Sequence, residues 1–229
     1  LDGPMRKPEF SSFVAPVNVP LCHQMTPGEC AEWIRTAMGL DLDLEVVRLV
    51  DWSHHDHEPW PNFVPPSPAI RSWDSAVMYP MTVFTEAYQS IDCDRFGALS
   101  FRIIGAPWMN QQALIKDLRP GLASCGVEMR PYRYMPADGK YRNVALDGIL
   151  FSVGNPSAFY PVTAGVLILT ALIQRHGEKV LVGGRDEWFD KLTDSTMIRD
   201  ALAAGDLSSM FQSWIDAQDL YIKTKVNLY

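Results

Sequence analysis

Apolar positions at helical spacing predict several helices along the chain. The clearest start is Thr26-Pro27-Gly28-Glu29, where threonine takes the cap, proline the first helical position and glutamate the third. Apolar residues then recur every three or four positions until Gly39, where the helix is expected to end. Further apolar or amphipathic stretches predict helices over residues 110–121, 162–176, 189–192, 196–204 and 207–221.

Shorter segments rich in Val, Ile and Leu predict strands between these helices. They cover residues 44–50, 99–104, 127–135 and 144–153, and residues 76–84 indicate a short helix followed by a strand. Because strands and helices alternate, we expect an α/β fold, with α+β as the alternative, in which a layered mixed sheet is flanked by helices.

Two segments are expected to be irregular. Residues 1–20 contain four prolines and few helix formers, which indicates an extended entry segment. Residues 51–68 hold five prolines, three histidines and two tryptophans. Such a long irregular segment in a compact domain usually carries function or covers a groove.

Charge and hydropathy exclude two classes of protein. The net charge is −7, and the Lys and Arg residues are scattered among acids, so we expect no nucleic-acid partner. No apolar run approaches the roughly 20 residues that a membrane helix needs. The most apolar run, residues 164–173, is short enough to be a buried helix, so we expect no membrane span.

The cysteines and the common fingerprints narrow the chemistry further. No two cysteines form a CxxC pair, so we expect buried free thiols, with a Cys22–Cys30 bridge as the alternative in an oxidising compartment. No GxSxG, HExxH or Walker sequence occurs, and we expect no cofactor. The first residue is Leu1 rather than Met, which indicates a processed product, an expressed piece or a fragment.

Histidines at two places are candidates for binding. The run 54–57 reads His-His-Asp-His, but neighbouring side chains of an extended segment point to opposite sides, so we favour an exposed polar loop and expect no metal site. His23 lies just before a predicted helix start. It either anchors the backbone there or donates to a ligand bound over the helix N-terminus, and both interpretations stay open.

Carboxylates and tryptophans are further candidates. Glu86 follows the strand-like run 81–85, and α/β folds place ligand contacts at strand ends. Asp92, Asp94 and Arg95 follow closely, and the alternative is a surface loop that contains a salt bridge. Trp60, Trp73 and Trp108 lie in proline-rich loops and suit sugar stacking, although we expect two of the three to close loops onto the core.

Several short motifs occur in an order similar to that of one known family. Gly105-Ala-Pro-Trp108 is identical to the GAPW motif of that family, and the motif order is intact over nearly the whole chain. The other matching stretches are residues 10–14, Pro20, 23–29, 63–68, 79–80, Glu86, Arg95, 130–136, 189–192, Arg199, Gly205 and 227–229. In the joint order of these motifs the chain resembles the NamZ-type exo-β-N-acetylmuramidases.

The resemblance implies a function and a domain organisation. Members are bacterial glycoside hydrolases that release N-acetylmuramic acid from the non-reducing end of peptidoglycan fragments, as in cell-wall recycling. They have an N-terminal Rossmann-like domain and a C-terminal α/β domain with a cleft between them. The resemblance places residues 1–229 in the C-terminal domain and leaves the N-terminal domain, with its catalytic glutamate in a GPEHG motif, outside this chain. It also suggests a secreted or periplasmic protein.

The resemblance also implies roles for individual residues. Glu86 would act as second carboxylate or as an acceptor for sugar hydroxyls, and Arg95 would bind the lactyl carboxylate of muramic acid. His23 would line the cleft, and Ser67 and Trp108 would shape the pocket. The expected partners are the missing N-terminal domain, or a partner chain that replaces it, and a muro-sugar ligand.

Departures from the family pattern keep two alternatives open. Residues 86–89 read EAYQ where the family has EGTN, Phe96 replaces a glycine, and Ala69 replaces an asparagine. A pocket that recognises sugar through hydrogen bonds is sensitive to such changes. The alternatives are a non-enzymatic carbohydrate-binding or protein-interaction domain and a related enzyme with a repurposed pocket. In the main hypothesis the domain forms one wall of a cleft and is inactive alone.

Overall fold

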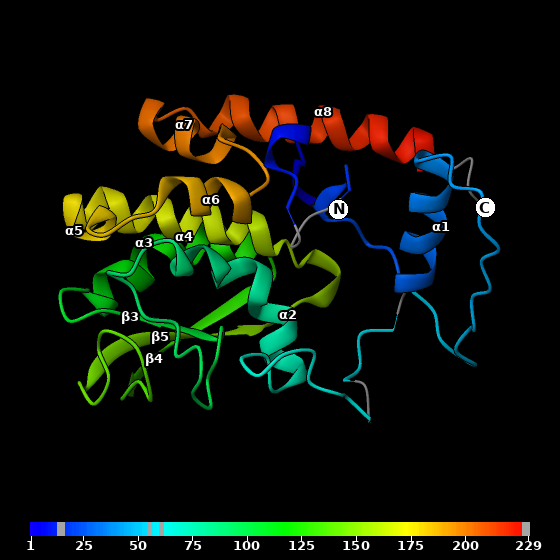
Figure 1. Ribbon diagram of the computed structural model, residues 1–229. Helices are drawn as coiled ribbons and strands as arrows, with labels where there is room; N and C mark the ends of the chain where they lie inside the picture. The colour runs from blue at the N-terminus through cyan, green and yellow to red at the C-terminus, as the bar shows by residue number, and fades with distance from the viewer. Residues whose placement is uncertain (13–16, 55, 60–61, 226–229) are drawn as a thin grey trace. The chain divides into compact units, whose positions relative to one another are not determined.

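This computed structural model describes residues 1–12, 17–54, 56–59 and 62–225 (Figure 1). The chain forms two units. One comprises Leu1–Glu58 together with Asp194–Tyr229, and the other comprises Pro59–Thr193.

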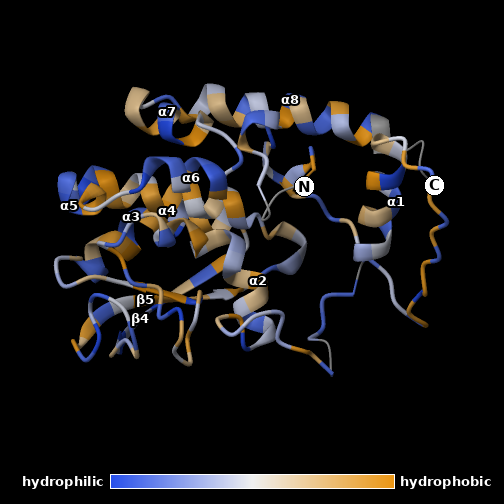
Figure 2. Cartoon of the chain, in the orientation of Figure 1, coloured by the Kyte–Doolittle hydropathy of each residue, from blue (hydrophilic) through white to orange (hydrophobic). Residues whose placement is uncertain are grey.

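The unit Pro59–Thr193 is built on an antiparallel sheet. Its strands β3 (Ile103–Gly105), β4 (Val127–Tyr134) and β5 (Leu146–Val153) lie in the order β3-β5-β4 among the described residues. The central strand β5 is buried through most of its length, and Figure 2 shows its apolar character. The edge strand β4 is mostly exposed and contains Pro131, a residue that edge strands tolerate because one side of their backbone has no strand partner.

Helices pack against this sheet and against one another. Helix α3 (Gln111–Ser124) contacts β4, β5 and α4 (Pro161–His176), and α4 contacts α2 (Trp73–Thr82). The interior of α4 is strongly apolar, and most of its first twelve residues are buried. The remaining elements of the unit are η2 (Val83–Glu86), η3 (Pro156–Ala158), α5 (Glu178–Leu181) and α6 (Asp186–Leu192).

The other unit combines both ends of the described chain. Strands β1 (Asp2–Met5) and β2 (Pro20–Cys22) pair antiparallel, and α8 (Leu207–Lys225) packs on β1. The ring of Trp33 on α1 (Pro27–Ala37) meets the ring of Tyr221 on α8 edge-on, with 5.5 Å between centroids. The short elements η1 (Pro8–Phe10) and α7 (Met197–Ala204) complete the unit.

The predicted fold class is confirmed as a mixture of helices and strands, with one difference in the sheets. Both described sheets are antiparallel rather than mixed. The predicted helices are present, and α1 begins with the expected capping box: Thr26 accepts from the amide of Glu29, and Glu29 accepts from the amide of Thr26.

Two strand predictions are wrong. Residues 44–50 form neither strand nor helix, because no described segment pairs with them. Residues 81–85 belong to α2 and η2, since that stretch is buried as a helix packed on α4. The four cysteines, Cys22, Cys30, Cys93 and Cys125, are free thiols. None of the described helices is both long enough and apolar enough to cross a membrane.

Candidate functional site

Glu86 closes the short helix η2, directly after α2. The side chain of Ser72 caps α2 by accepting from the amide of Ser75, which fixes where the helix begins. Phe84 and Thr85 of η2 are buried, and the side chain of Glu86 is only 11% exposed. The position therefore comes from a helix end rather than from the strand end that the sequence suggested.

Arg95 is carried by a loop that hydrogen bonds hold tightly. The amide of Asp94 donates to Oδ1 of Asp92 over 2.8 Å, and the amide of Leu99 donates to Oδ2 of Asp94 over 2.9 Å. Asp92 also exchanges backbone hydrogen bonds with Gly105 of β3. Asp94 adopts a positive φ of 49°, which Asp tolerates better than most residues. The loop therefore presents Arg95 from a fixed backbone.

The structure brings Glu86 and Arg95 into contact. Nε of Arg95 lies 3.3 Å from Oε1 of Glu86, and the arginine side chain is 51% exposed. Burial raises the pKa of Glu86 above its ordinary value, while the charges of Arg95 and Arg185 oppose that rise. A partly exposed ion pair of this kind contributes little to the stability of the fold. Its relevance is that it places the carboxylate and the guanidinium next to each other.

Arg185 is a residue near Glu86 that sequence reasoning missed. Its Nη2 donates to the backbone carbonyl of Glu86 over 2.7 Å, and its own amide donates to the carbonyl of Ala87 over 3.0 Å. Its guanidinium also lies over the ring of Trp188, 5.8 Å from the centroid. The two residues are 99 positions apart, and no motif links them. The positive charges of Arg95 and Arg185 both act on the carboxylate of Glu86 and lower its pKa.

Tyr79 and the turn at Ser67 lie beside the same region. Ala69 and Phe101 form a buried cluster with Cys93, and Tyr79 packs on it with its ring 4.9 Å from that of Phe101. Burial raises the pKa of Tyr79, and the negative charge of Glu86 adds to the effect. The hydroxyl of Ser67 accepts from the amides of Ala69 and Ile70, so Ser67 shapes a turn next to this cluster.

Trp108 follows β3 and has His176 as its neighbour. The two rings lie 4.9 Å apart, and Nε2 of His176 accepts from the amide of Asn110, where α3 starts. Burial lowers the pKa of His176, and the charges of Arg175 and Lys179 add to the effect. These contacts give Trp108 a role in holding the end of α4 against the start of α3, and its predicted sugar contact stays a prediction.

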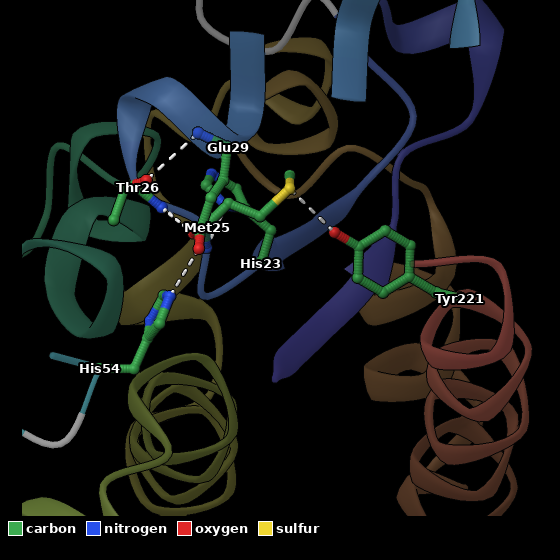
Figure 3. A network of polar contacts seen from close by, with 6 residues as sticks. All are labelled: His23, Met25, Thr26, Glu29, His54 and Tyr221. Atoms are coloured by element: carbon green, nitrogen blue, oxygen red, sulfur yellow. Dashed lines mark hydrogen bonds and ion pairs between the residues drawn. The ribbon is translucent and has the colours of Figure 1, made fainter. Parts of the chain in front are cut away.

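His23 belongs to the unit that contains α1, and Figure 3 shows its surroundings. Its Nδ1 accepts from the amide of Met25 over 3.0 Å, which supports the backbone-anchor interpretation. Nε2 of His54 lies 2.8 Å from Oε1 of Glu29, the capping-box glutamate. The hydroxyl of Tyr221 reaches Sδ of Met25 at 3.4 Å. A role for His23 in ligand binding stays a prediction.

The remaining candidates from the sequence are the histidine run 54–57, two tryptophans and the last residues of the chain. Among the described residues no group of three or more potential ligands could hold a metal ion, and His55 lies outside that part of the chain. Trp60 also lies outside the described residues, as does the closing stretch 227–229. Trp73 is the first residue of α2 rather than part of a loop, and its ring meets that of Phe63 edge-on at 6.0 Å, so the segment around Phe63 packs on this helix.

Comparisons with known proteins divide the chain differently from the sequence prediction. The family model for the N-terminal part of exo-β-N-acetylmuramidase NamZ matches residues 1–74, and the model for its C-terminal part matches residues 77–229. The expectation that N-terminal domain sequence is absent is therefore not supported. The boundary between the models lies near residue 75, just after the start of α2.

Two similar proteins extend this result. The chain is 29% identical over 231 residues to the peptidoglycan β-N-acetylmuramidase NamZ of Bacillus subtilis (strain 168), which covers 98% of this chain and 54% of the relative. The chain thus spans about half the length of this curated relative. A crystal structure of a DUF1343 family protein from Bacteroides fragilis has the same fold, with a TM-score of 0.87 and 19% identity over 100% of this chain and 62% of that one. Together with the two family models, the comparisons show that this chain belongs to the exo-β-N-acetylmuramidase NamZ family.

Proposed function

We propose that this chain forms one wall of a binding site for peptidoglycan fragments that contain N-acetylmuramic acid, in a glycoside hydrolase of the muramidase type. Arg95 binds the lactyl carboxylate of the sugar, and Glu86 accepts hydrogen bonds from sugar hydroxyls or acts as the second carboxylate. The observation that carries the proposal is the contact of 3.3 Å between Glu86 and Arg95. Family membership and the name of the B. subtilis relative support the substrate class.

Charge and exposure support the division of roles between these two residues. The exposed half of Arg95 is accessible to a ligand, and a guanidinium fork fits a carboxylate. Arg185 supplies the second positive charge, so a bound anion need not displace Glu86. The raised pKa of Glu86 is the direction that a proton donor or a neutral hydrogen-bonding group requires.

We further propose that these 229 residues alone do not complete hydrolysis. Glycoside hydrolysis ordinarily uses two carboxyl groups on opposite sides of the bond. Glu86 supplies one, and Arg95 and Arg185 are the charged groups that accompany it. We expect the isolated chain to bind N-acetylmuramic acid weakly and to show no turnover of a chromogenic muramic-acid glycoside.

The test compares two chromogenic glycosides in the complete protein that the gene encodes. N-acetylmuramic acid and N-acetylglucosamine glycosides differ by the lactyl group that Arg95 would bind. A lost charged hydrogen bond costs about 1.5–3 kcal/mol. Arg95→Ala should therefore lower kcat/KM for the muramic glycoside by about 10- to 100-fold, mainly through KM, with little effect on the other glycoside.

Matched controls separate this role from a general loss of charge. Arg119→Ala removes an exposed arginine on α3 and should leave both activities unchanged. Arg95→Lys retains the charge without the fork and should show an intermediate effect. Equal kinetics for Arg95→Ala and the parent protein on the muramic glycoside would remove Arg95 from the site.

One observation favours a second candidate, a non-enzymatic carbohydrate-binding domain. Phe96 stands where the family has a glycine, and its partly exposed ring lies 5.2 Å from the guanidinium carbon of Arg95. An aromatic ring beside a cation is better suited to stacking against a sugar ring than to a catalytic step. Calorimetric binding of N-acetylmuramic acid by a complete protein that hydrolyses neither glycoside would favour this candidate.

A further inference from the structure

Two aromatic side chains of α8 donate hydrogen bonds to methionine sulfur atoms. Nε1 of Trp214 donates to Sδ of Met197, the first residue of α7, over 3.1 Å. The hydroxyl of Tyr221 donates to Sδ of Met25 over 3.4 Å, as Figure 3 shows. Met25 directly precedes Thr26, the residue that caps α1. The two methionines therefore connect α8 to α7 and to the start of α1.

The donors of these two bonds are buried, whereas the sulfur acceptors belong to side chains closer to solvent. Trp214 and Tyr221 are each 3% exposed and lie on the inner face of α8. Met25 and Met197 are half-buried. A thioether sulfur is a weak acceptor, so each bond depends on the close fit between the two side chains. A small reagent can therefore reach sulfur atoms that buried aromatic side chains use as partners.

We propose that Met25 and Met197 are oxidation sites at which a hydroperoxide weakens the attachment of α8 to its unit. In this reaction the thioether sulfur attacks the outer oxygen of the hydroperoxide, so an S–O bond forms and the O–O bond breaks. The sulfur gives up two electrons, and the hydroxyl proton passes to the departing oxygen, which leaves as water or an alcohol. The product is methionine sulfoxide. This inference does not depend on the proposed sugar site.

A sulfoxide fits neither contact. An oxygen on the side of the donor needs more room than the 3.1 Å at Met197 or the 3.4 Å at Met25 provides, so the aromatic side chain must withdraw. An oxygen on the other side of the sulfur adds a polar group beside buried aromatic rings, which is unfavourable unless that group is hydrogen-bonded. Either product loosens the packing of the inner face of α8.

A further attachment of α8 limits how far the helix is released. Nε2 of Gln218 donates to the backbone carbonyl of Gly3 in β1 over 2.8 Å, and peroxide leaves an amide–carbonyl bond intact. The edge-on contact between the rings of Tyr221 and Trp33 also contains no sulfur. Oxidation should therefore make local opening of α8 more frequent rather than detach the helix outright.

The cysteines of the same unit are poorer targets for peroxide at neutral pH. The thiolate is the form of cysteine that reacts. Burial raises the pKa of Cys22 to about 12, and burial also raises the pKa of Cys30, so both thiols stay protonated near neutral pH. A thioether has no proton to lose, so its reaction does not depend on ionisation. We therefore expect the response of this unit to peroxide to come from its methionines.

The experiment treats the complete protein that the gene encodes with hydrogen peroxide near neutral pH. Dithiothreitol is added afterwards, because it reverses disulfides and sulfenic acids but leaves sulfoxides in place. Peptide mass spectrometry measures the sulfoxide fraction at each methionine, and hydrogen–deuterium exchange of residues 207–225 measures the opening of α8.

Leucine variants separate these two sites from other methionines. The test variant combines Met25→Leu with Met197→Leu, because leucine keeps a similar apolar volume without sulfur. Its control is Met38→Leu, since Met38 is a 63% exposed methionine at the end of α1 in the same unit. Restoration of the oxidised parent protein by methionine sulfoxide reductases provides a second test that does not depend on how well the double variant folds.

The proposal predicts both an order of oxidation and a response of α8. Met25 and Met197 should be oxidised well before Met81, which has no exposed surface. Once both are sulfoxides, residues 207–225 should exchange about 10-fold faster and the melting temperature should fall by about 3–6 °C. The reductases should reverse both changes. The double leucine variant should not respond to peroxide, and Met38→Leu should respond like the parent protein.

Any one of four results would overturn the proposal. The first is unchanged exchange of α8 when Met25 and Met197 are fully converted to sulfoxides. The second is an equal response of the double leucine variant and the parent protein, which would assign the effect to another group. The third is a loss of protection that the reductases do not reverse. The fourth is oxidation of the two methionines no faster than that of Met81, which would mean that peroxide reaches them only after unfolding.

Discussion

The hydroxyl of Tyr134 donates a hydrogen bond of 2.8 Å to Oδ1 of Asp92 and so ties strand β4 to the loop that carries Arg95. The tyrosine ring lies over two glycines, since a Cβ at Gly105 or Gly148 would come within 2.7 Å of its atoms. Because Gly105 of β3 and Gly148 of β5 have no side chain, the tyrosine ring can lie over them, and its hydroxyl reaches the loop. We therefore expect the loop that carries Arg95 to depend in part on this contact across the sheet.

Replacing this tyrosine tests the dependence. Tyr134→Phe keeps the ring and leaves a half-buried carboxylate with one donor fewer, so the free energy of unfolding should fall by about 1–2 kcal/mol. Burial already raises the pKa of Asp92, and loss of the bond from Tyr134 should raise it further. Urea unfolding measures the stability change. Tyr132→Phe, at an exposed position of the same strand, is the control and should change stability by less than about 0.5 kcal/mol.

The titration of Glu86 provides a second prediction. The pKa of Glu86 is raised by burial and held down by Arg95 and Arg185, so removal of either cation should raise it further. Arg95→Ala and Arg185→Ala should both shift the midpoint of the Glu86 carboxyl ¹³C resonance to higher pH, whereas Arg95→Lys should shift it less. An unchanged midpoint in Arg95→Ala would mean that the contact of 3.3 Å is not kept in solution.

Local sequence signals correctly predicted where individual helices begin and end. The capping box of Thr26 and Glu29 identified the start of α1, and Gly205, with a positive φ of 71°, ends α7 as the sequence indicated. These features depend on neighbours within a few positions. The stretch 44–50 has an equally clear strand pattern, but a strand needs a partner, and none lies in the described chain.

The contacts that form the candidate site join residues whose spacing along the sequence does not predict a contact. Thr82, Val83 and Thr85 favour strands by propensity, yet packing of α2 on α4 makes that stretch helical and moves Glu86 to a helix end. The motifs that resemble the family point to Glu86 and Arg95, but their spacing along the chain does not predict that the two side chains are in contact. Arg185 reaches Glu86 from 99 positions away through tertiary folding alone, so no local pattern could have identified it.

Asp194 gives the protein a predictable dependence of stability on pH. Its side chain is buried with Oδ1 lacking a hydrogen-bond partner in the described chain, and burial raises the pKa to about 7 against the opposing charge of Arg6. A folded-state pKa above the unfolded value means that the protonated acid is favoured by folding. Its stabilising effect is complete below about pH 4 and is lost as pH rises toward 7.

The free energy of unfolding should therefore fall by up to about 1.4 kcal/mol per pH unit between pH 4 and pH 7 because of this residue. Asp194→Asn removes the titration and should flatten that part of the profile, with its largest gain over the parent above pH 7. Asparagine also tolerates the positive φ of 57° at this position. Urea unfolding at four pH values checks the slope, and parallel profiles for the two proteins would contradict the assignment.

Gly165 of α4 tests how the helix that precedes Glu86 is positioned. A Cβ at this position would come 2.5 Å from the backbone carbonyl oxygen of Met81 in α2, and backbone cannot yield as a side chain can. Gly165→Ala gains about 1 kcal/mol of helix propensity. The overlap must push α2 and η2 away from α4, at a cost of about 1–3 kcal/mol that should outweigh or cancel the gain.

A second helical glycine provides the comparison for this substitution. At Gly121 of α3 a Cβ would meet only the side chain of Leu167, with its Cδ1 at 3.1 Å and its Cγ at 4.0 Å, and that side chain can rotate. Gly121→Ala should therefore stabilise the protein by up to about 1 kcal/mol. Because η2 continues directly from α2, Gly165→Ala should also perturb the ¹³C resonance of the Glu86 carboxyl, and Gly121→Ala should not. Equal stabilisation by both alanines would show that α2 has room to move away from α4 without loss, and that Gly165 does not fix the position of Glu86.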